Sequence, residues 1–93
     1  ALQDQDVGVR ISAVSALARI GPAAKDAVPA LSDALKDQDE GVRMSAAYAL
    51  TRIGPVAKEA VPALVKLLQG QDMYVRWSAA KALGEIGLVY RHV

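Results

Sequence analysis

Three arginines recur at a constant interval of 33 residues, and each follows an aspartate by four residues. The six residues are Asp6 and Arg10, Asp39 and Arg43, and Asp72 and Arg76. Evenly spaced guanidinium groups could contact the phosphates of a nucleic acid. An aspartate four residues before an arginine is within pairing reach on a helix, however, so the two charges can balance within the protein. The pattern favours a structural role for these residues, and no nucleic-acid partner is expected.

Side chains for enzymatic or metal chemistry are scarce. The chain has one histidine, His92, and no cysteine. Metal ligation needs several convergent donors, and nucleophilic catalysis needs a base held against the nucleophile. Serine recurs as Ser12, Ser45 and Ser78, but a repeated serine in an alanine-rich helix is typical of a small packing residue. We therefore expect neither enzymatic activity nor a bound cofactor or metal.

The overall composition indicates one small helical domain. The 93 residues are 53% hydrophobic, with no phenylalanine and with much alanine, the strongest helix former. A net charge of +1 provides no general attraction to nucleic acid or to an anionic membrane. No apolar run approaches the roughly 20 residues that cross a bilayer, and a chain without cysteine suits a reducing compartment. We expect a cytoplasmic protein that does not bind membranes.

The repeated residues extend beyond the charged pairs and predict a helix in each repeat. The stretch from Asp6 to about Ile20 returns from 39 to 53 and from 72 to 86. Its apolar residues recur at steps of three and four, so they share one helical face that we expect to form the core. In the first repeat they are Val9, Ala13, Ala16, Leu17 and Ile20. The aspartates fit as N-caps, and three glycines fit as C-terminal stops, namely Gly21, Gly54 and Gly87.

A second helix is predicted in the first two repeats, at about 26 to 36 and 59 to 69. A Gly-Pro pair introduces each segment, and Pro29 and Pro62 fall early in the helix, where proline is tolerated. A constant helical period of this size indicates a solenoid. Residues 1–93 form a single segment of it, with repeat units of about 6–38, 39–71 and 72–93, and the last unit is incomplete because the pattern breaks off after Gly87.

The motif Asp-x-x-Val-Arg-x-x-Ala-x-x-Ala-Leu-x-x-Ile-Gly, followed by Ala-Val-Pro-Ala-Leu, resembles the HEAT repeat over essentially the whole chain. It is most similar to the short bacterial repeats also found in phycobilin lyases, and it resembles artificial HEAT-type binders. The resemblance implies an all-α solenoid of antiparallel helix pairs with about five helices. Three of them would be inner, concave helices, and two would be outer helices that carry the prolines. It also implies that the repeated arginines and aspartates form a ladder between adjacent repeats.

Differences between the repeats gather on one side of the first helix. The columns that change are Val7/Glu40/Met73, Ile11/Met44/Trp77, Ser15/Tyr48/Lys81 and Ala18/Thr51/Gly84, while Gly8/Gly41/Tyr74 changes only in the last copy. Positions 7, 11, 15 and 18 are separated by steps of four, four and three, so they share a helical face that is distinct from the core stripe. Aromatic residues and methionine are common interface anchors, so we interpret this face as a protein- or peptide-binding surface centred on Trp77 and Tyr48. Its expected contact residues are Ile11, Met44, Tyr48, Met73, Tyr74, Trp77 and Lys81.

Two other interpretations stay open. The varied residues could instead pack within the solenoid or reflect drift at tolerant positions. The chain could also be a structural unit that self-associates, because neither end has the polar cap that solenoids normally need, and in that case we expect a homo-oligomer. A lyase-like role in chromophore attachment rests on the resemblance alone, and a designed protein and a recent natural duplication would explain the close agreement of the repeats equally well.

Overall fold

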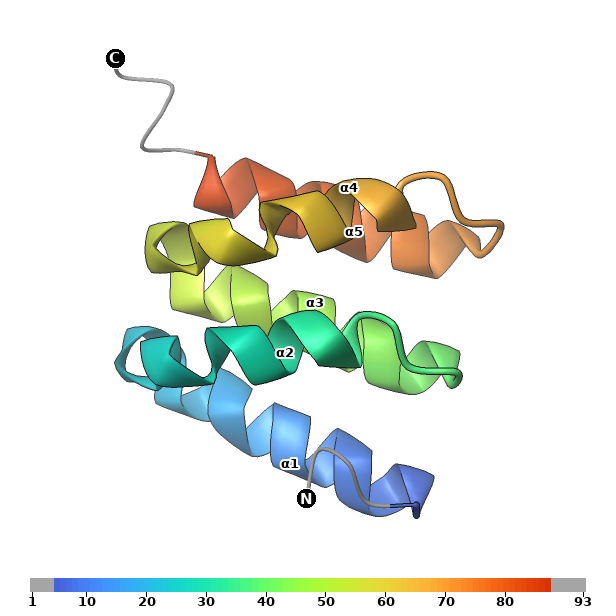
Figure 1. Ribbon diagram of the computed structural model, residues 1–93, viewed down its shortest axis with the longest axis horizontal. Coiled ribbons are helices and arrows are strands. Elements are labelled where there is room, and N and C mark those ends of the chain that lie inside the picture. Colours follow the sequence, from blue (N-terminus) through green and yellow to red (C-terminus); the bar gives the residue numbers. More distant parts are fainter. Residues whose placement is uncertain (1–4, 88–93) are drawn as a thin grey trace.

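The computed structural model describes residues 5–87, and this part of the chain is a stack of helices without strands (Figure 1). The α-helices are α1 (Val7–Ile20), α2 (Val28–Ala34), α3 (Glu40–Ile53), α4 (Val61–Leu67) and α5 (Met73–Ile86). Two 3-10 helices, η1 (Gly21–Ala27) and η2 (Gly54–Ala60), join α1 to α2 and α3 to α4. No helix between residues 5 and 87 is long and apolar enough to cross a bilayer. The predicted all-α fold with about five helices is confirmed.

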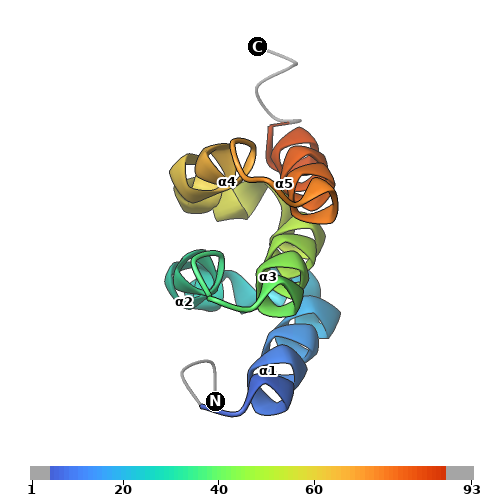
Figure 2. The same ribbon diagram turned by 90° about the vertical axis from the view of Figure 1, so that its right-hand side faces the viewer.

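The helices form two layers. α1, α3 and α5 lie side by side in one layer, and α2 and α4 form the other (Figure 1, Figure 2). Each helix of the second layer runs back along the helix that precedes it, so α1 with α2 and α3 with α4 are antiparallel pairs. Successive pairs stack in the same way, which is the α-solenoid arrangement that the 33-residue period predicts.

Each long helix begins after the aspartate that the sequence predicts as its N-cap. The Asp6 carboxylate accepts hydrogen bonds from the backbone N–H groups of residues 8 and 9 at 2.7 and 3.2 Å. Asp72 accepts from residues 74 and 75 at 2.8 and 3.0 Å, and Asp39 accepts from Val42 at 3.1 Å. These bonds satisfy N–H groups that lack a partner in the first turn of a helix.

Glycine ends α1 and α3 as predicted. Gly21 and Gly54 have φ angles of 67° and 80°, which residues with a Cβ rarely adopt. Gly87 also follows the last residue of its helix, but its φ is −79° and its N–H bonds to the Leu83 carbonyl at 2.8 Å. The Gly87 backbone therefore stays in the right-handed region, and α5 ends without the reversal seen in the first two repeats.

The helices of the second layer are shorter than the predicted stretches of about 26 to 36 and 59 to 69. α2 and α4 each span seven residues. The residues before them form η1 and η2, with non-helical angles at Ala24 (φ −90°, ψ 18°) and Ala57 (φ −89°, ψ 20°). A proline in the first turn of α2 and of α4 has no N–H to continue a helix from the preceding segment. Two lysines lie exposed on the 3-10 helices, namely Lys25 and Lys58.

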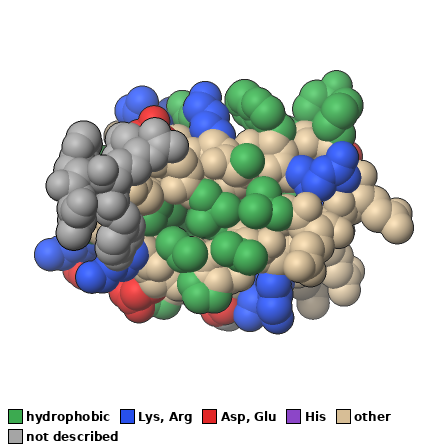
Figure 3. Space-filling view, turned by 90° about the horizontal axis from the view of Figure 1, so that it is seen from above, with side chains coloured by type: hydrophobic (Ala, Val, Ile, Leu, Met, Phe, Trp, Pro, Cys, Tyr) green, Lys and Arg blue, Asp and Glu red, His purple; other side chains and the backbone are tan. Residues whose placement is uncertain are grey.

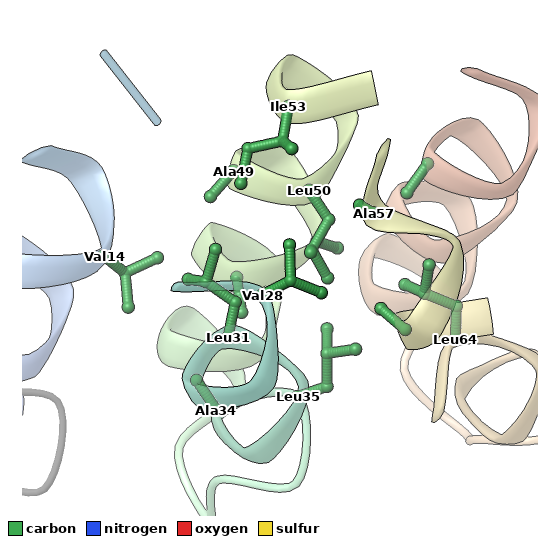
Figure 4. Close-up of a cluster of buried hydrophobic side chains, with 14 of the residues drawn as sticks. Val14, Val28, Leu31, Ala34, Leu35, Ala49, Leu50, Ile53, Ala57 and Leu64 are labelled. Carbon is green, nitrogen blue, oxygen red and sulfur yellow. The ribbon is translucent and has the colours of Figure 1, made fainter. Parts of the chain in front are cut away.

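The hydrophobic core lies between the layers and between successive repeats (Figure 4). The central helix α3 contributes a stripe with almost no exposed surface: Val42, Ala46, Ala49, Leu50 and Ile53. Leucines of the second layer pack against this cluster, among them Leu31, Leu35 and Leu64. Because many core positions are alanine, the helices can approach closely and the larger leucine and isoleucine side chains fill the remaining space.

The predicted core face is only partly buried in the first repeat. Val9 and Ile20 are 41% and 54% exposed, whereas their equivalents on α3, Val42 and Ile53, are 0% and 2% exposed. Between residues 5 and 87, no helix covers this side of α1, while the same side of α3 packs on α1. The prediction of a buried stripe is therefore correct for α3 and α5 and wrong for the outer part of α1.

Candidate protein-binding surface

The residues that vary between repeats lie along α1, α3 and α5, and we call their surface the varied face. It comprises Val7, Gly8, Ile11, Ser15 and Ala18 with their equivalents 33 and 66 positions later. On α3 this face is opposite the core stripe, since Glu40 and Tyr48 are exposed and Met44 and Thr51 are half-buried. The sequence prediction of a face distinct from the core therefore agrees with the burial pattern on the central helix.

One column of the varied face lies partly in the seam between neighbouring helices. Ile11 is half-buried against α3. Its Cδ1 atom packs so close to Gly41 that a Cβ added to this glycine would lie 3.3 Å from it. In the last column, Ala18 is also buried. Trp77, the equivalent of Ile11 on α5, is 62% exposed because no helix of the described residues follows α5. Its exposure thus owes much to its place in the last described helix, which a comparison of repeats does not show.

The most exposed part of the varied face is the first half of α5. Met73, Tyr74 and Trp77 are each more than half exposed. The Lys81 Nζ atom lies 5.0 Å from the centroid of the Trp77 ring, which is the geometry of a cation–π contact. Four of the seven predicted contact residues are thus neighbours on one helix. Tyr48, on the adjacent α3, is 54% exposed.

A pocket of about 260 Å³ lies on the varied face between α1 and α3. Its lining residues are Ser15, Ala18, Arg19, Tyr48 and Arg52. Only Tyr48 among them is a predicted contact residue. Ser15 and Ala18 belong to the varied columns, whereas Arg19 and Arg52, at equivalent positions in successive repeats, lie outside those columns. Both arginines lie in the last turns of their helices, where cations are favoured. The signal that could have found the pocket is their spacing of four residues from Ser15 and Tyr48, which places both pairs on the same side of a helix.

The repeated arginines of the predicted ladder contact the segments that connect the repeats. Arg10 Nε lies 2.8 Å from Asp37 Oδ2, and an Nη of Arg10 donates to Asp37 Oδ1 at 3.2 Å. Arg43 donates to the backbone carbonyls of Asp37 and Gln38 at 2.6 and 3.0 Å. Arg76 donates to the Gly70 carbonyl at 2.8 Å. Asp37 therefore joins the first repeat to the second, a role that the sequence comparison did not single out because Gly70 replaces it in the next repeat.

The environment of Asp37 stabilises its ionised form. Partial burial acts to raise its pKa, but a hydrogen bond from the Asp39 N–H and the adjacent Arg10 guanidinium together outweigh this effect. The pKa of Asp37 consequently lies below its ordinary value of 3.8. This ion pair is largely shielded from solvent, with side chains 14% and 13% exposed, and it fixes the connection between α2 and α3 against α1.

Two carboxyl groups meet at one edge of the varied face. A hydrogen bond with Asp72 and the negative charge of that residue raise the pKa of Glu40, while the same hydrogen bond lowers the pKa of Asp72. The pair links the start of α3 to the N-cap of α5. Between residues 5 and 87, no group of three or more potential ligands could hold a metal ion.

Antiparallel helix pairs that stack at a constant period, with variable side chains on one layer, define an α-solenoid repeat protein. Residues 1–58 match the family model for HEAT repeats, and residues 60–90 match a second model for the HEAT repeat. The chain belongs to the HEAT-repeat family. No curated protein matches it.

Proposed function

We propose that this chain is a non-enzymatic scaffold that binds a protein or peptide through the varied face. HEAT repeats often serve as scaffolds for protein interactions, which supports this class of function. The cysteine-free composition suits a cytoplasmic location, which is part of the proposal. The observation that carries the proposal is the placement of Tyr48, Met73, Tyr74 and Trp77, which are large, apolar and exposed on a frame that otherwise repeats almost unchanged.

Tyr48 is the most informative of these residues because it lies on the central helix. Both neighbouring inner helices are present beside α3, yet Tyr48 is 54% exposed. Its exposure therefore does not come from a position at the end of the stack, unlike that of Trp77. An exposed aromatic ring offers a large, rigid contact area at little entropic cost, and such residues often dominate the energy of an interface.

Binding to a selected peptide provides the test. Peptides would be selected from a displayed random library against the immobilised chain, and the affinity of a synthesised winner would be measured for the parent and for two variants. Tyr48→Ala should weaken binding by about tenfold or more. Val56→Ala, which removes a half-exposed apolar side chain from η2, should leave the affinity unchanged. Failure to enrich any peptide, or equal affinity of Tyr48→Ala and the parent, would refute the proposal.

Self-assembly through the ends of the stack is the second candidate, and the exposed core stripe of α1 favours it. Ile20 and Val9 are exposed there. At the opposite end, formed by α4 and α5, hydrophobic side chains gather along the middle of the surface (Figure 3). Val65 and Leu68 of this end are 44% and 40% exposed. Because α3 packs on α1 through the same face that α1 leaves open, a second copy could stack its α1 on the far end of the first.

Sedimentation velocity over a concentration series tests this second candidate. The parent should associate as its concentration rises, and Ile20→Lys should shift the equilibrium toward the monomer. Ala30→Lys adds the same charge to the exposed surface of α2 and should leave the association unchanged. A parent that stays monomeric at all concentrations would exclude self-assembly and leave the varied face as the proposed site.

A further inference from the structure

We propose that the pocket between α1 and α3 receives an acidic side chain, so that the partner of the varied face is an acidic peptide segment. This inference rests on the proposed function and specifies the chemistry of its ligand. The pocket is lined by Ser15, Ala18, Arg19, Tyr48 and Arg52. It spans the seam between α1 and α3, so both of its walls belong to helices that the structure describes.

Two guanidinium groups supply the charge of the pocket. Arg19 and Arg52 occupy equivalent positions near the C-terminal ends of α1 and α3, which lie side by side. In the described part of the chain, neither forms an ion pair or a hydrogen bond with another side chain. The helix dipole explains why a cation is tolerated at each helix end. It does not explain why two positive charges line one pocket, where they repel each other.

The acidic residues of α3 and α5 do not neutralise the two guanidinium groups of the pocket. Glu85 occupies the equivalent position on α5 but makes no ion pair with Arg52. Glu40 lies at the other end of α3, where its carboxyl is engaged with Asp72. A carboxylate of a partner placed between Arg19 and Arg52 could accept hydrogen bonds from both, and charge-assisted bonds of this kind are stronger than neutral ones.

The surroundings of the pocket favour a peptide over a nucleic acid. The cationic column ends after two positions because Glu85 takes the third. A phosphate backbone would instead need cations that continue along the face. Tyr48 forms one wall of the pocket, and the exposed Trp77 and Tyr74 lie on the next helix. An extended segment that crosses α1, α3 and α5 could thus place a carboxylate in the pocket and an apolar side chain against Trp77.

The test uses the same peptide selection with a charge-matched pair of variants. Peptides enriched on the parent chain should carry aspartate or glutamate beside an apolar or aromatic residue. The double variant Arg19→Gln/Arg52→Gln should bind the winning peptide about tenfold to a hundredfold more weakly. The double variant Lys25→Gln/Lys58→Gln removes the same charge from the same two repeats, outside the pocket, and should bind like the parent. Replacing the acidic residue of the peptide by its amide should reproduce the loss on the parent and cause no further loss on the arginine variant.

The possible failures separate the two proposals. Winning peptides that require Tyr48 but lack an acid, or that bind the arginine variant as well as the parent, would overturn the acidic-pocket inference alone. Peptides that do not require Tyr48 would overturn the proposed function as well. A short single-stranded DNA that competes with the acidic peptide at equal affinity would overturn the inference in favour of a phosphate site. Circular dichroism of each variant establishes that the fold is retained.

Discussion

Isoleucine occupies the same position at the end of α1, α3 and α5, which allows a comparison in which burial is the main difference. Ile20, Ile53 and Ile86 each precede a C-cap glycine, but they are 54%, 2% and 0% exposed. We predict that replacement by alanine lowers the free energy of unfolding by very different amounts at the three positions. The comparison tests the central claim that the fold is stabilised by contacts between successive repeats.

The expected magnitudes follow from the exposed fractions. Removing a fully buried isoleucine side chain costs its transfer free energy and the energy of the cavity that remains, together about 2–5 kcal/mol. We expect this loss for Ile53→Ala and Ile86→Ala. Ile20 buries about half of its surface and leaves no enclosed cavity, so Ile20→Ala should cost about half of the 1.5–3 kcal/mol of full burial, or about 1 kcal/mol.

Urea denaturation followed by circular dichroism at two protein concentrations would measure these differences. The slope of unfolding free energy against urea concentration should be unchanged if the variants keep the same fold. If Ile20→Ala lowers the free energy of unfolding as much as Ile53→Ala does, at both concentrations, Ile20 is not exposed on α1 as the structure has it. A loss of about 1 kcal/mol or less for Ile53→Ala would refute the claim that the seam between repeats carries the stability.

Results are expected for four further substitutions. Trp77→Ala should lower the free energy of unfolding by less than about 1 kcal/mol in the same urea titration, because most of the ring is already exposed. Asp37→Asn should lower the melting temperature at about pH 7 and match the parent at about pH 2. The lowered pKa of Asp37 means that its ionised form stabilises the fold above the unfolded pKa, and this stability is lost as pH falls through the folded pKa. Gly84→Ala should stabilise the chain by about 0.5–1 kcal/mol, because a Cβ there meets nothing within 4 Å inside a helix, whereas Gly54→Ala should destabilise it by about 1–2 kcal/mol because its φ is 80°.

Features set by local chemistry could be predicted from the sequence. The N-caps at Asp6, Asp39 and Asp72 depend on a carboxylate and the two or three residues after it, and all three predictions are confirmed. The helical stripe of α3 likewise follows from spacing along one helix. The starts of α2 and α4 could not be predicted as well, because a Gly-Pro segment can enter either a loop or a 3-10 helix before the α-helix begins.

Features set by neighbouring repeats were harder to predict. The columns of Ile11 and Tyr48 differ by one helical turn, yet the first faces the seam and the second faces outward. Which column faces the seam depends on how each helix is turned about its own axis relative to its neighbour, and the spacing of residues along one helix does not give this orientation. The partner of Arg10 was missed for a related reason, since Asp37 lies in a connection and has no equivalent in the next repeat. The pocket between Arg19 and Arg52 also arises only when two helices are placed side by side.

The central position of α3 also affects the order in which the fold can open. α1 packs on α3 and η1, and α5 packs on α3, η2 and α4, whereas α3 is held on both sides. α1 or α5 can detach while the rest of the stack stays packed, but α3 cannot leave without breaking its contacts with both of them. Local opening should therefore begin at α1, whose outer face is already solvated, and backbone amides in the middle of α3 should exchange with solvent most slowly. The Tyr48 side of the varied face would then stay folded while its margins fray.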